Sequence, residues 1–133
     1  MTRREAREQA FILVFEKIFN PELSLDEMKN IAEDEELFVL DEFAENIVKA
    51  VFDNIEAIDK EITLYLRNWT IDRIPKVDLA VLRLAAGEIL YIDDIPDKVA
   101  ANEAVELTKK YSGEERAKFI NGVLGNLIRA KNG

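Results

Sequence analysis

The chain has 133 residues, of which 48% are hydrophobic and 34% charged, with a net charge of −9, which is typical of one globular domain spanning residues 1–133. It contains no cysteine and no histidine, which excludes disulfides, zinc–cysteine centres, thiol nucleophiles and the Ser–His and Cys–His pairs of hydrolases. The longest unbroken apolar run, 10–15, is too short for a signal sequence or a membrane span, so we expect a cytoplasmic protein.

The negative charge is concentrated in the middle of the chain. Residues 21–60 carry thirteen acidic and three basic side chains. Residues 1–20 carry four basic and three acidic side chains, and residues 61–133 carry eleven of each. Because the local field decides where a polyanion approaches, this distribution disfavours nonspecific nucleic-acid binding but leaves room for a local site.

Helical periodicity predicts an all-α, single-domain bundle of about six to seven helices. Two capping boxes, Thr2 with Glu5 and Ser24 with Glu27, mark the starts of the first two helices. Apolar spacings of three and four continue through most of the remaining chain. We expect helices at about 2–19, 24–32, 40–67, 76–92, 97–111 and 114–131, with the acidic run 33–36 as a connector and a single turn capped by Thr70.

The first predicted helix begins with three arginines, Arg3, Arg4 and Arg7, and the first and last share a face because they lie four residues apart. Positive charge at a helix N-terminus costs roughly 0.3–1 kcal/mol. The cluster is therefore either a solvated basic end or a contact for an anionic partner.

An apolar block at 11–15 follows these arginines. Five consecutive apolar residues place apolar side chains on every side of the helix. A helix of this kind is either buried on all sides or keeps one side for a partner. Phe15 and Phe19, four residues apart, are the aromatic side chains expected on such a surface.

Two predicted helices each carry a stripe of small residues flanked by cations. At 100° per residue, the members of each stripe share one side of the helix. A glycine inside a helix costs roughly 1 kcal/mol relative to alanine. The stripes therefore indicate a close approach, either of a neighbouring helix or of an RNA backbone whose phosphates the cations neutralise. The stripes consist of Lys76, Ala80, Arg83 and Gly87, and of Lys118, Gly122, Gly125 and Arg129.

Phe119 lies at the edge of the apolar side of the last predicted helix. It is either a core side chain or a surface on which an unpaired base stacks, worth roughly 1–3 kcal/mol. Asn102 and Glu103 interrupt an apolar segment and predict a half-buried polar pair that needs partners. The carboxylates around Pro96 are typical of turns and helix caps. We therefore predict no catalytic residue, no cofactor and no metal site.

Three consecutive motifs carry a resemblance to a known family. They are W-T-I-D-R-I-P-K-V-D-L-A-V-L-R-L from residue 69, D-I-P-D-K-V-A-A-N-E-A-V-E-L from residue 94, and K-F-I-N-G-V-L-G-N-L from residue 118. Together with the weaker T-R-R-E-A-R-E-Q-A near the start, they resemble the NusB family of transcription antitermination factors. The segment at about 21–59 adds little to this resemblance.

The resemblance implies an all-helical protein that is not an enzyme. It implies binding to a single-stranded leader RNA called boxA, jointly with the ribosomal protein NusE. It also implies a place in the elongation complex with other Nus factors and RNA polymerase, which supports ribosomal RNA transcription. Carried across by motif, RNA contacts fall on Arg3, Arg4, Arg7, Lys76, Arg83, Lys98, Lys118 and Phe119, and NusE contacts fall on Phe15 and Asp78.

Glu5 and Glu8 interrupt the arginine cluster that family members carry near the start. This departure favours joint recognition, in which NusE supplies affinity that the thinned cluster lacks. The alternative is a protein–protein adaptor or homodimer of the same fold with little RNA affinity. The same fold also occurs attached to ribosomal RNA methyltransferases, but we expect no methyl-donor-binding domain in this chain.

Overall fold

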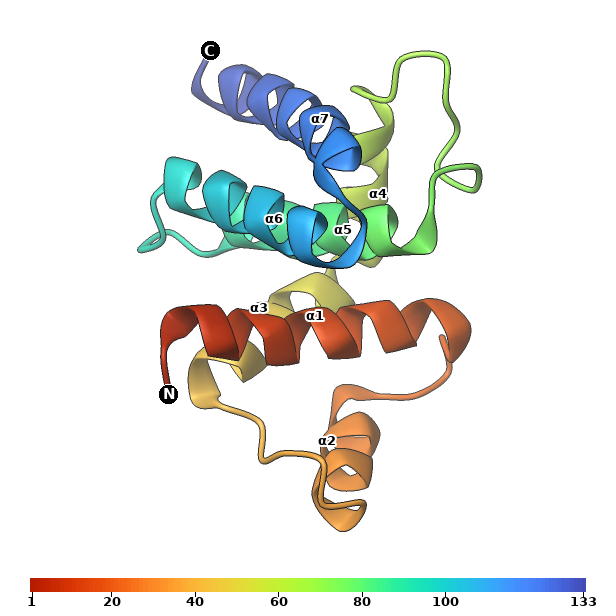
Figure 1. Ribbon diagram of the computed structural model, residues 1–133, viewed down its shortest axis with the longest axis vertical. Coiled ribbons are helices and arrows are strands. Elements are labelled where there is room, and N and C mark those ends of the chain that lie inside the picture. The colour runs from red at the N-terminus through yellow and green to blue at the C-terminus, as the bar shows by residue number, and fades with distance from the viewer.

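The computed structural model describes residues 1–133 and consists of seven helices without strands (Figure 1). This confirms the predicted all-α fold. No helix combines the length and the apolar character that crossing a membrane requires. The helices are α1 (Arg3–Phe19), α2 (Leu25–Asp34), α3 (Glu42–Asp53), α4 (Ile55–Thr63), α5 (Lys76–Tyr91), α6 (Asp97–Tyr111) and α7 (Glu114–Asn132).

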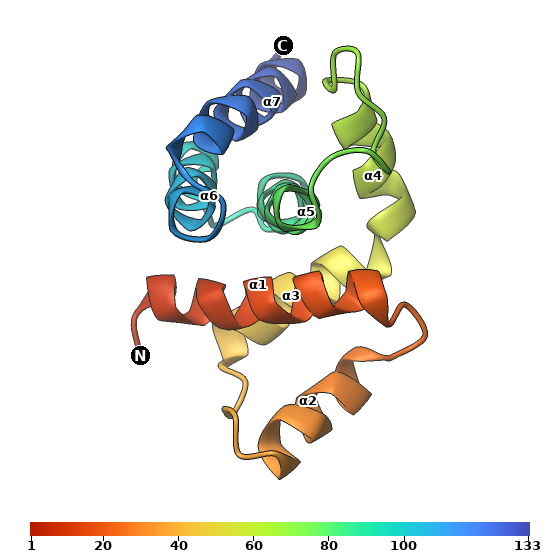
Figure 2. The same ribbon diagram turned by 45° about the vertical axis from the view of Figure 1, so that its right-hand side comes forward.

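Helix α5 lies at the centre of the molecule. In Figure 2 it is seen nearly end-on, with α1 and α3 below it, α6 to the left, α4 to the right and α7 above. It packs against all five of these helices, and its buried residues include Leu82, Leu84 and Ile89. The buried apolar side chains form one continuous cluster that is centred on this helix.

Both predicted capping boxes are present. The Thr2 hydroxyl accepts a hydrogen bond from the Glu5 amide, and the Glu5 carboxylate accepts one from the Thr2 amide. Ser24 and Glu27 form the same pair at the start of α2. These bonds satisfy amides that a helix N-terminus leaves unpaired, so they fix where α1 and α2 begin.

The single helix predicted over 40–67 is wrong, because the chain breaks at Asn54 into α3 and α4. The Asn54 backbone leaves the helical region, at φ −132° and ψ 24°, and its side-chain amide donates to the Ala50 carbonyl at 2.8 Å. An asparagine side chain competes in this way with the helical hydrogen bonds. The break lets α4 change direction and pack against α5 and α7 (Figure 2).

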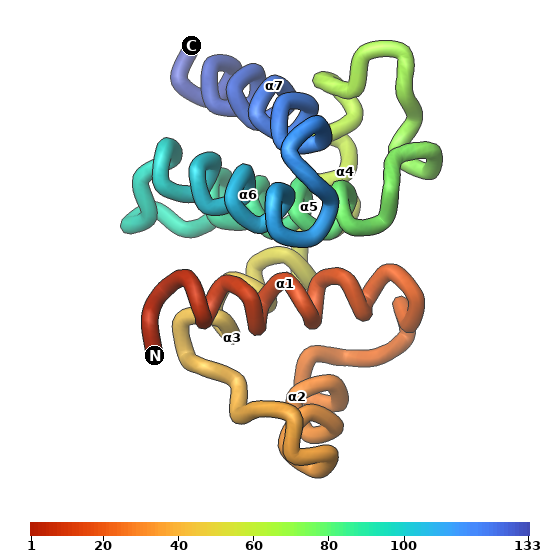
Figure 3. Tube along the Cα trace, viewed as in Figure 1, coloured from red at the N-terminus to blue at the C-terminus, as the bar shows by residue number.

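A long connection, 64–75, joins α4 to α5 and forms the extended loop beside α7 in Figure 3. The turn predicted at Thr70 is present, since the Arg73 amide donates to the Thr70 carbonyl at 3.0 Å. Between α6 and α7 the predicted join at 112–113 also holds. Gly113 adopts φ +96° there, a conformation that glycine adopts without steric cost.

Candidate RNA and partner interface

Arg3 and Arg4 lie exposed at the start of α1, as a phosphate contact requires. The Arg3 guanidinium lies 4.0 Å from the centre of the Phe43 ring and forms no ion pair. The Arg4 side chain is 65% exposed, but its Nε and Nη2 donate to the two carboxylate oxygens of Glu103 at 3.3 and 2.8 Å. RNA would therefore compete with Glu103 for Arg4. This contact also supplies the partner predicted for Glu103.

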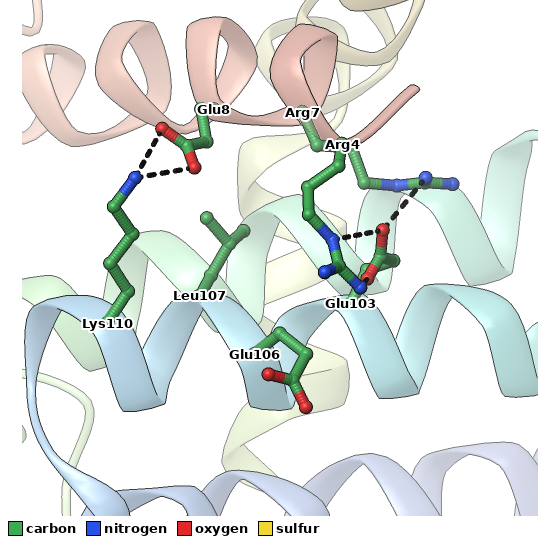
Figure 4. Close-up of a pocket in the computed structure, with 7 residues that line it drawn as sticks. All are labelled: Arg4, Arg7, Glu8, Glu103, Glu106, Leu107 and Lys110. Carbon is green, nitrogen blue, oxygen red and sulfur yellow. Dashed lines mark hydrogen bonds and ion pairs between the residues drawn. The ribbon is translucent and has the colours of Figure 1, made fainter. Parts of the chain in front are cut away.

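The Arg4–Glu103 pair belongs to a charged cleft of about 280 Å³ between α1 and α6 (Figure 4). At the other end of this cleft, Lys110 donates to both carboxylate oxygens of Glu8 at 2.8 and 3.0 Å. Hydrogen bonding to Glu103 raises the pKa of Arg4, and hydrogen bonding to Glu8 raises the pKa of Lys110. The two ion pairs tie α1 to α6.

The third arginine of the cluster, Arg7, is buried. Its Nε and Nη2 donate to one oxygen of Glu88, at 2.9 and 2.8 Å, and its Nη1 lies 3.8 Å from Glu103. Burial raises the pKa of Glu88, and Arg7 opposes this shift by favouring the ionised form. Since its guanidinium is enclosed by carboxylates of α5 and α6, this position argues against the phosphate contact expected of Arg7.

Apart from the exposed Lys76 at its start, the stripe on α5 packs inside the molecule. Arg83 donates to both oxygens of Asp59 at 2.9 and 2.8 Å, and its side chain is only 13% exposed. Ala80 is buried, and a Cβ at Gly87 would lie 2.5 Å from Cγ2 of Val51. Close helix packing therefore explains this stripe, and the paired Arg83 is not free for the expected phosphate contact.

The stripe on α7 lies at the surface. Lys118 is exposed, and Phe119 is half-buried with the Arg116 guanidinium 4.8 Å from its ring centre. No atom of another element lies within 4 Å of a Cβ built at Gly122, which is also exposed. Internal packing therefore does not account for Gly122. Of the two explanations for the stripe, a neighbouring helix and an RNA backbone, only the RNA backbone is compatible with this position.

The remaining expected RNA contacts divide into two groups. Lys98, near the start of α6, is exposed and unpaired, at the end of α6 that is nearer to the arginines of α1. Lys76 and Lys118 are also exposed and unpaired, but they lie near the starts of α5 and α7, which are close to the other end of α6. The fifteen residues of α6 extend about 22 Å. One RNA strand that touches both groups must follow this helix.

Asp78, an expected NusE contact, is fully buried. Its Oδ1 accepts a hydrogen bond from the Ser112 hydroxyl at 3.2 Å, and its Oδ2 accepts one from Arg116 Nε at 2.7 Å. The carboxylate therefore ties the start of α5 to the turn between α6 and α7. This position argues against direct contact with a partner and makes Asp78 a positioning residue.

Phe15, the other expected NusE contact, is half-buried in an aromatic row along α1. Its ring centre lies 5.9 Å from that of Phe11 and 5.1 Å from that of Phe19, which is 55% exposed. Tyr111 extends the row from α6, 4.9 Å from Phe11. The spacing of four residues indicates the three phenylalanines, but only the packing of α6 on α1 adds Tyr111.

Comparisons with known proteins identify the family of this chain. A sequence model of the NusB family matches residues 4–129. The transcription antitermination protein NusB of Listeria monocytogenes serotype 4a (strain HCC23) is 49% identical over 128 residues, which make up 96% of each chain. T. maritima NusB has a TM-score of 0.81 and 32% identity, covering 97% of this chain and 92% of its own.

A further solved structure contains antitermination factors NusB and NusE in complex with dsRNA. Its matching chain has a TM-score of 0.83 and 29% identity, and the match covers 96% of each chain. The Listeria relative is an antitermination protein, and its similarity to this chain extends over nearly the whole length of the chain. The chain therefore belongs to the NusB family, whose members are transcription antitermination factors and not enzymes.

Proposed function

We propose that this protein binds a boxA-type single-stranded leader RNA jointly with ribosomal protein NusE. It then acts in the cytoplasm, within the elongation complex of other Nus factors and RNA polymerase, to support ribosomal RNA transcription. The similarity to the NusB chain solved with NusE and dsRNA, which extends over 96% of this chain, supports RNA and NusE as partners. The single-stranded boxA specificity and the role in ribosomal RNA transcription are what the resemblance to the family implies.

For the RNA side, we propose direct phosphate contacts by the exposed cations Arg3, Arg4, Lys76, Lys98 and Lys118. On Arg3, Lys76, Lys98 and Lys118 no carboxylate neutralises the positive charge, which supplies affinity through counterion release. Arg4 joins them once a phosphate displaces Glu103. Phe119 is the proposed stacking residue, because its half-buried ring is held at the surface beside Lys118. Arg7 and Arg83 are proposed to fix the helices that carry these contacts.

For the NusE side, we propose the aromatic row of α1, with Phe15 and Phe19 as direct contacts. Exposed aromatic side chains next to one another are typical of protein interfaces, since they offer a large apolar area at little conformational cost. Asp78 supports this surface indirectly by holding the turn after Tyr111.

The test is a titration of labelled boxA-type RNA with the protein alone and with equimolar NusE. We expect NusE to raise the RNA affinity at least tenfold, which corresponds to about 1.4 kcal/mol of coupling. A scrambled RNA and a duplex of the same sequence serve as controls, and both should bind more weakly. Equal affinities with and without NusE would contradict joint recognition. Binding to NusE or self-association without any RNA affinity would favour the adaptor or homodimer.

A further inference from the structure

A second surface pocket lies between α7 and the connection 64–75. It has a volume of about 390 Å³. Three aromatic residues, Tyr65, Trp69 and Phe119, and three cations, Arg67, Lys118 and Arg129, contribute to its lining. Only Lys118 and Phe119 belong to the RNA contacts proposed above.

The charge of this pocket is unusual for such an acidic protein. None of the residues that line it is acidic, although the chain carries a net charge of −9. Arg67, Lys118 and Arg129 are exposed and form no ion pair, and Arg129 donates only to the neutral side chain of Asn126. Three uncompensated cations around one concave surface attract an anionic ligand.

The aromatic side chains suit the face of a nucleobase. Trp69 lies on a loop and is 51% exposed. Its large apolar ring therefore contributes little to stability through burial. Tyr65 is half-buried beside it. Any of the four bases can stack on such rings, but only when the base is unpaired and not held inside an RNA duplex.

The floor of the pocket contains Gly122 on the exposed side of α7. Since nothing lies within 4 Å of its Cβ position, an alanine would fit there and would favour the helix by roughly 1 kcal/mol. Its glycine therefore has no explanation in the packing of this chain. A ligand that lies directly on the helix backbone explains it.

We propose that this pocket is a subsite for one unpaired nucleotide of RNA, and this inference rests on the function proposed above. The base stacks on Trp69 over the Gly122 surface, while Arg67 and Arg129 neutralise the neighbouring phosphates. The subsite extends the RNA surface from α7 onto the connection 64–75. It also lets the protein distinguish single-stranded RNA from a duplex, because a paired base cannot enter it.

The chain supplies its own reporter for this inference, because Trp69 is the only tryptophan. Titration with single-stranded boxA-type RNA should change its intrinsic fluorescence at saturation, whereas a duplex of the same sequence should change it much less. An unchanged fluorescence at saturating single-stranded RNA would overturn the subsite.

Variants separate this subsite from the rest of the RNA surface. Trp69→Ala should lower the affinity for single-stranded RNA roughly tenfold at every salt concentration, because stacking releases no counterions. Trp69→Phe should retain most of the affinity. Leu64→Ala, which removes an exposed apolar side chain from the same connection outside the pocket, is the matched control.

Gly122→Leu tests the floor without harming the fold. The leucine side chain should fill the pocket and weaken RNA binding at least fivefold, while the thermal stability stays equal or rises because leucine favours the helix. Asn121→Ala, an exposed neighbour outside the pocket, should leave RNA binding unchanged.

Different results would overturn the proposed RNA-binding function and the proposed nucleotide subsite. If the wild-type protein binds no RNA with or without NusE, the proposed function fails and the subsite with it. If the wild-type protein binds RNA and Trp69→Ala binds equally well, only the subsite is overturned. Loss of NusE binding in Trp69→Ala, with RNA affinity intact, would overturn it in favour of a protein contact.

Discussion

Arg7 and Glu88 form an ion pair inside the protein, with Nε and Nη2 of Arg7 2.9 and 2.8 Å from one carboxylate oxygen of Glu88. Their side chains are 5% and 2% exposed. The pair joins α1 to the central helix α5, and no buried side-chain polar atom in the molecule lacks a hydrogen-bond partner. An arginine from a basic motif thus contributes to folding, because an unpaired charge at this depth would be costly.

Arg7→Met should lower the free energy of unfolding by roughly 3–5 kcal/mol at pH 8, because Glu88 would be left as an unpaired buried charge. Burial already raises the pKa of Glu88, and losing Arg7 should raise this pKa further. The folded variant then binds a proton that the unfolded chain releases, so its stability falls as pH rises from the unfolded pKa to the folded one. The loss should therefore be smaller at pH 5 than at pH 8.

Urea denaturation at both pH values measures this difference. The control is Arg7→Met combined with Glu88→Gln. This double variant has no buried carboxyl at position 88, so its loss of stability relative to wild type should change little with pH. A single variant whose loss of stability is the same at pH 5 and pH 8 would contradict the role assigned to Glu88.

Glu103→Gln should raise the affinity for single-stranded RNA several-fold at low salt. The substitution keeps the side-chain shape but weakens the hold of residue 103 on Arg4, which is then free to contact a phosphate. Glu8→Gln is the matched control, because Glu8 lines the same cleft but pairs with Lys110. Fluorescence anisotropy with labelled RNA measures both variants. An equal rise in both would assign the effect to overall charge, not to Arg4.

The combined change Arg3→Ala and Arg4→Ala should flatten the slope of log affinity against log salt by about 1–2 units, at roughly 0.7 per phosphate contact on a single strand. Phe119→Ala should lower the affinity by a similar factor at every salt concentration, because stacking releases no counterions. Circular dichroism must first show that Phe119→Ala is folded, since Phe119 is half-buried. If the double variant keeps the wild-type slope, the start of α1 is not on the RNA.

Phe19→Asp should weaken NusE binding at least tenfold and leave the helical content unchanged, because this ring is exposed in the free protein. Phe15→Asp should weaken binding too, with some loss of stability because Phe15 is half-buried. Ile31→Asp, at an exposed apolar residue of α2 whose surrounding pocket includes no member of the aromatic row, is the control. Binding measured by calorimetry, beside circular dichroism, distinguishes the outcomes. NusE binding by Phe19→Asp at wild-type affinity would remove this row from the interface.

The sequence by itself determined the starts of α1 and α2 and the family. Thr2 with Glu5 and Ser24 with Glu27 fix their helices through contacts three residues apart, so their signal is complete within a short window. The family motifs are also read directly along the chain. For the same reason, Phe15 and Phe19 were recognisable as one aromatic surface.

Only the tertiary structure decided which charged residues are free to bind. Arg7 and Arg83 look like Arg3 and Arg4 in the sequence, but they meet Glu88 and Asp59, which lie 81 and 24 residues away. A cation on a helix has the same local pattern whether it faces water or a distant carboxylate. Its role depends on which helices pack together, and that packing follows from burial of the whole core and not from any local sequence window.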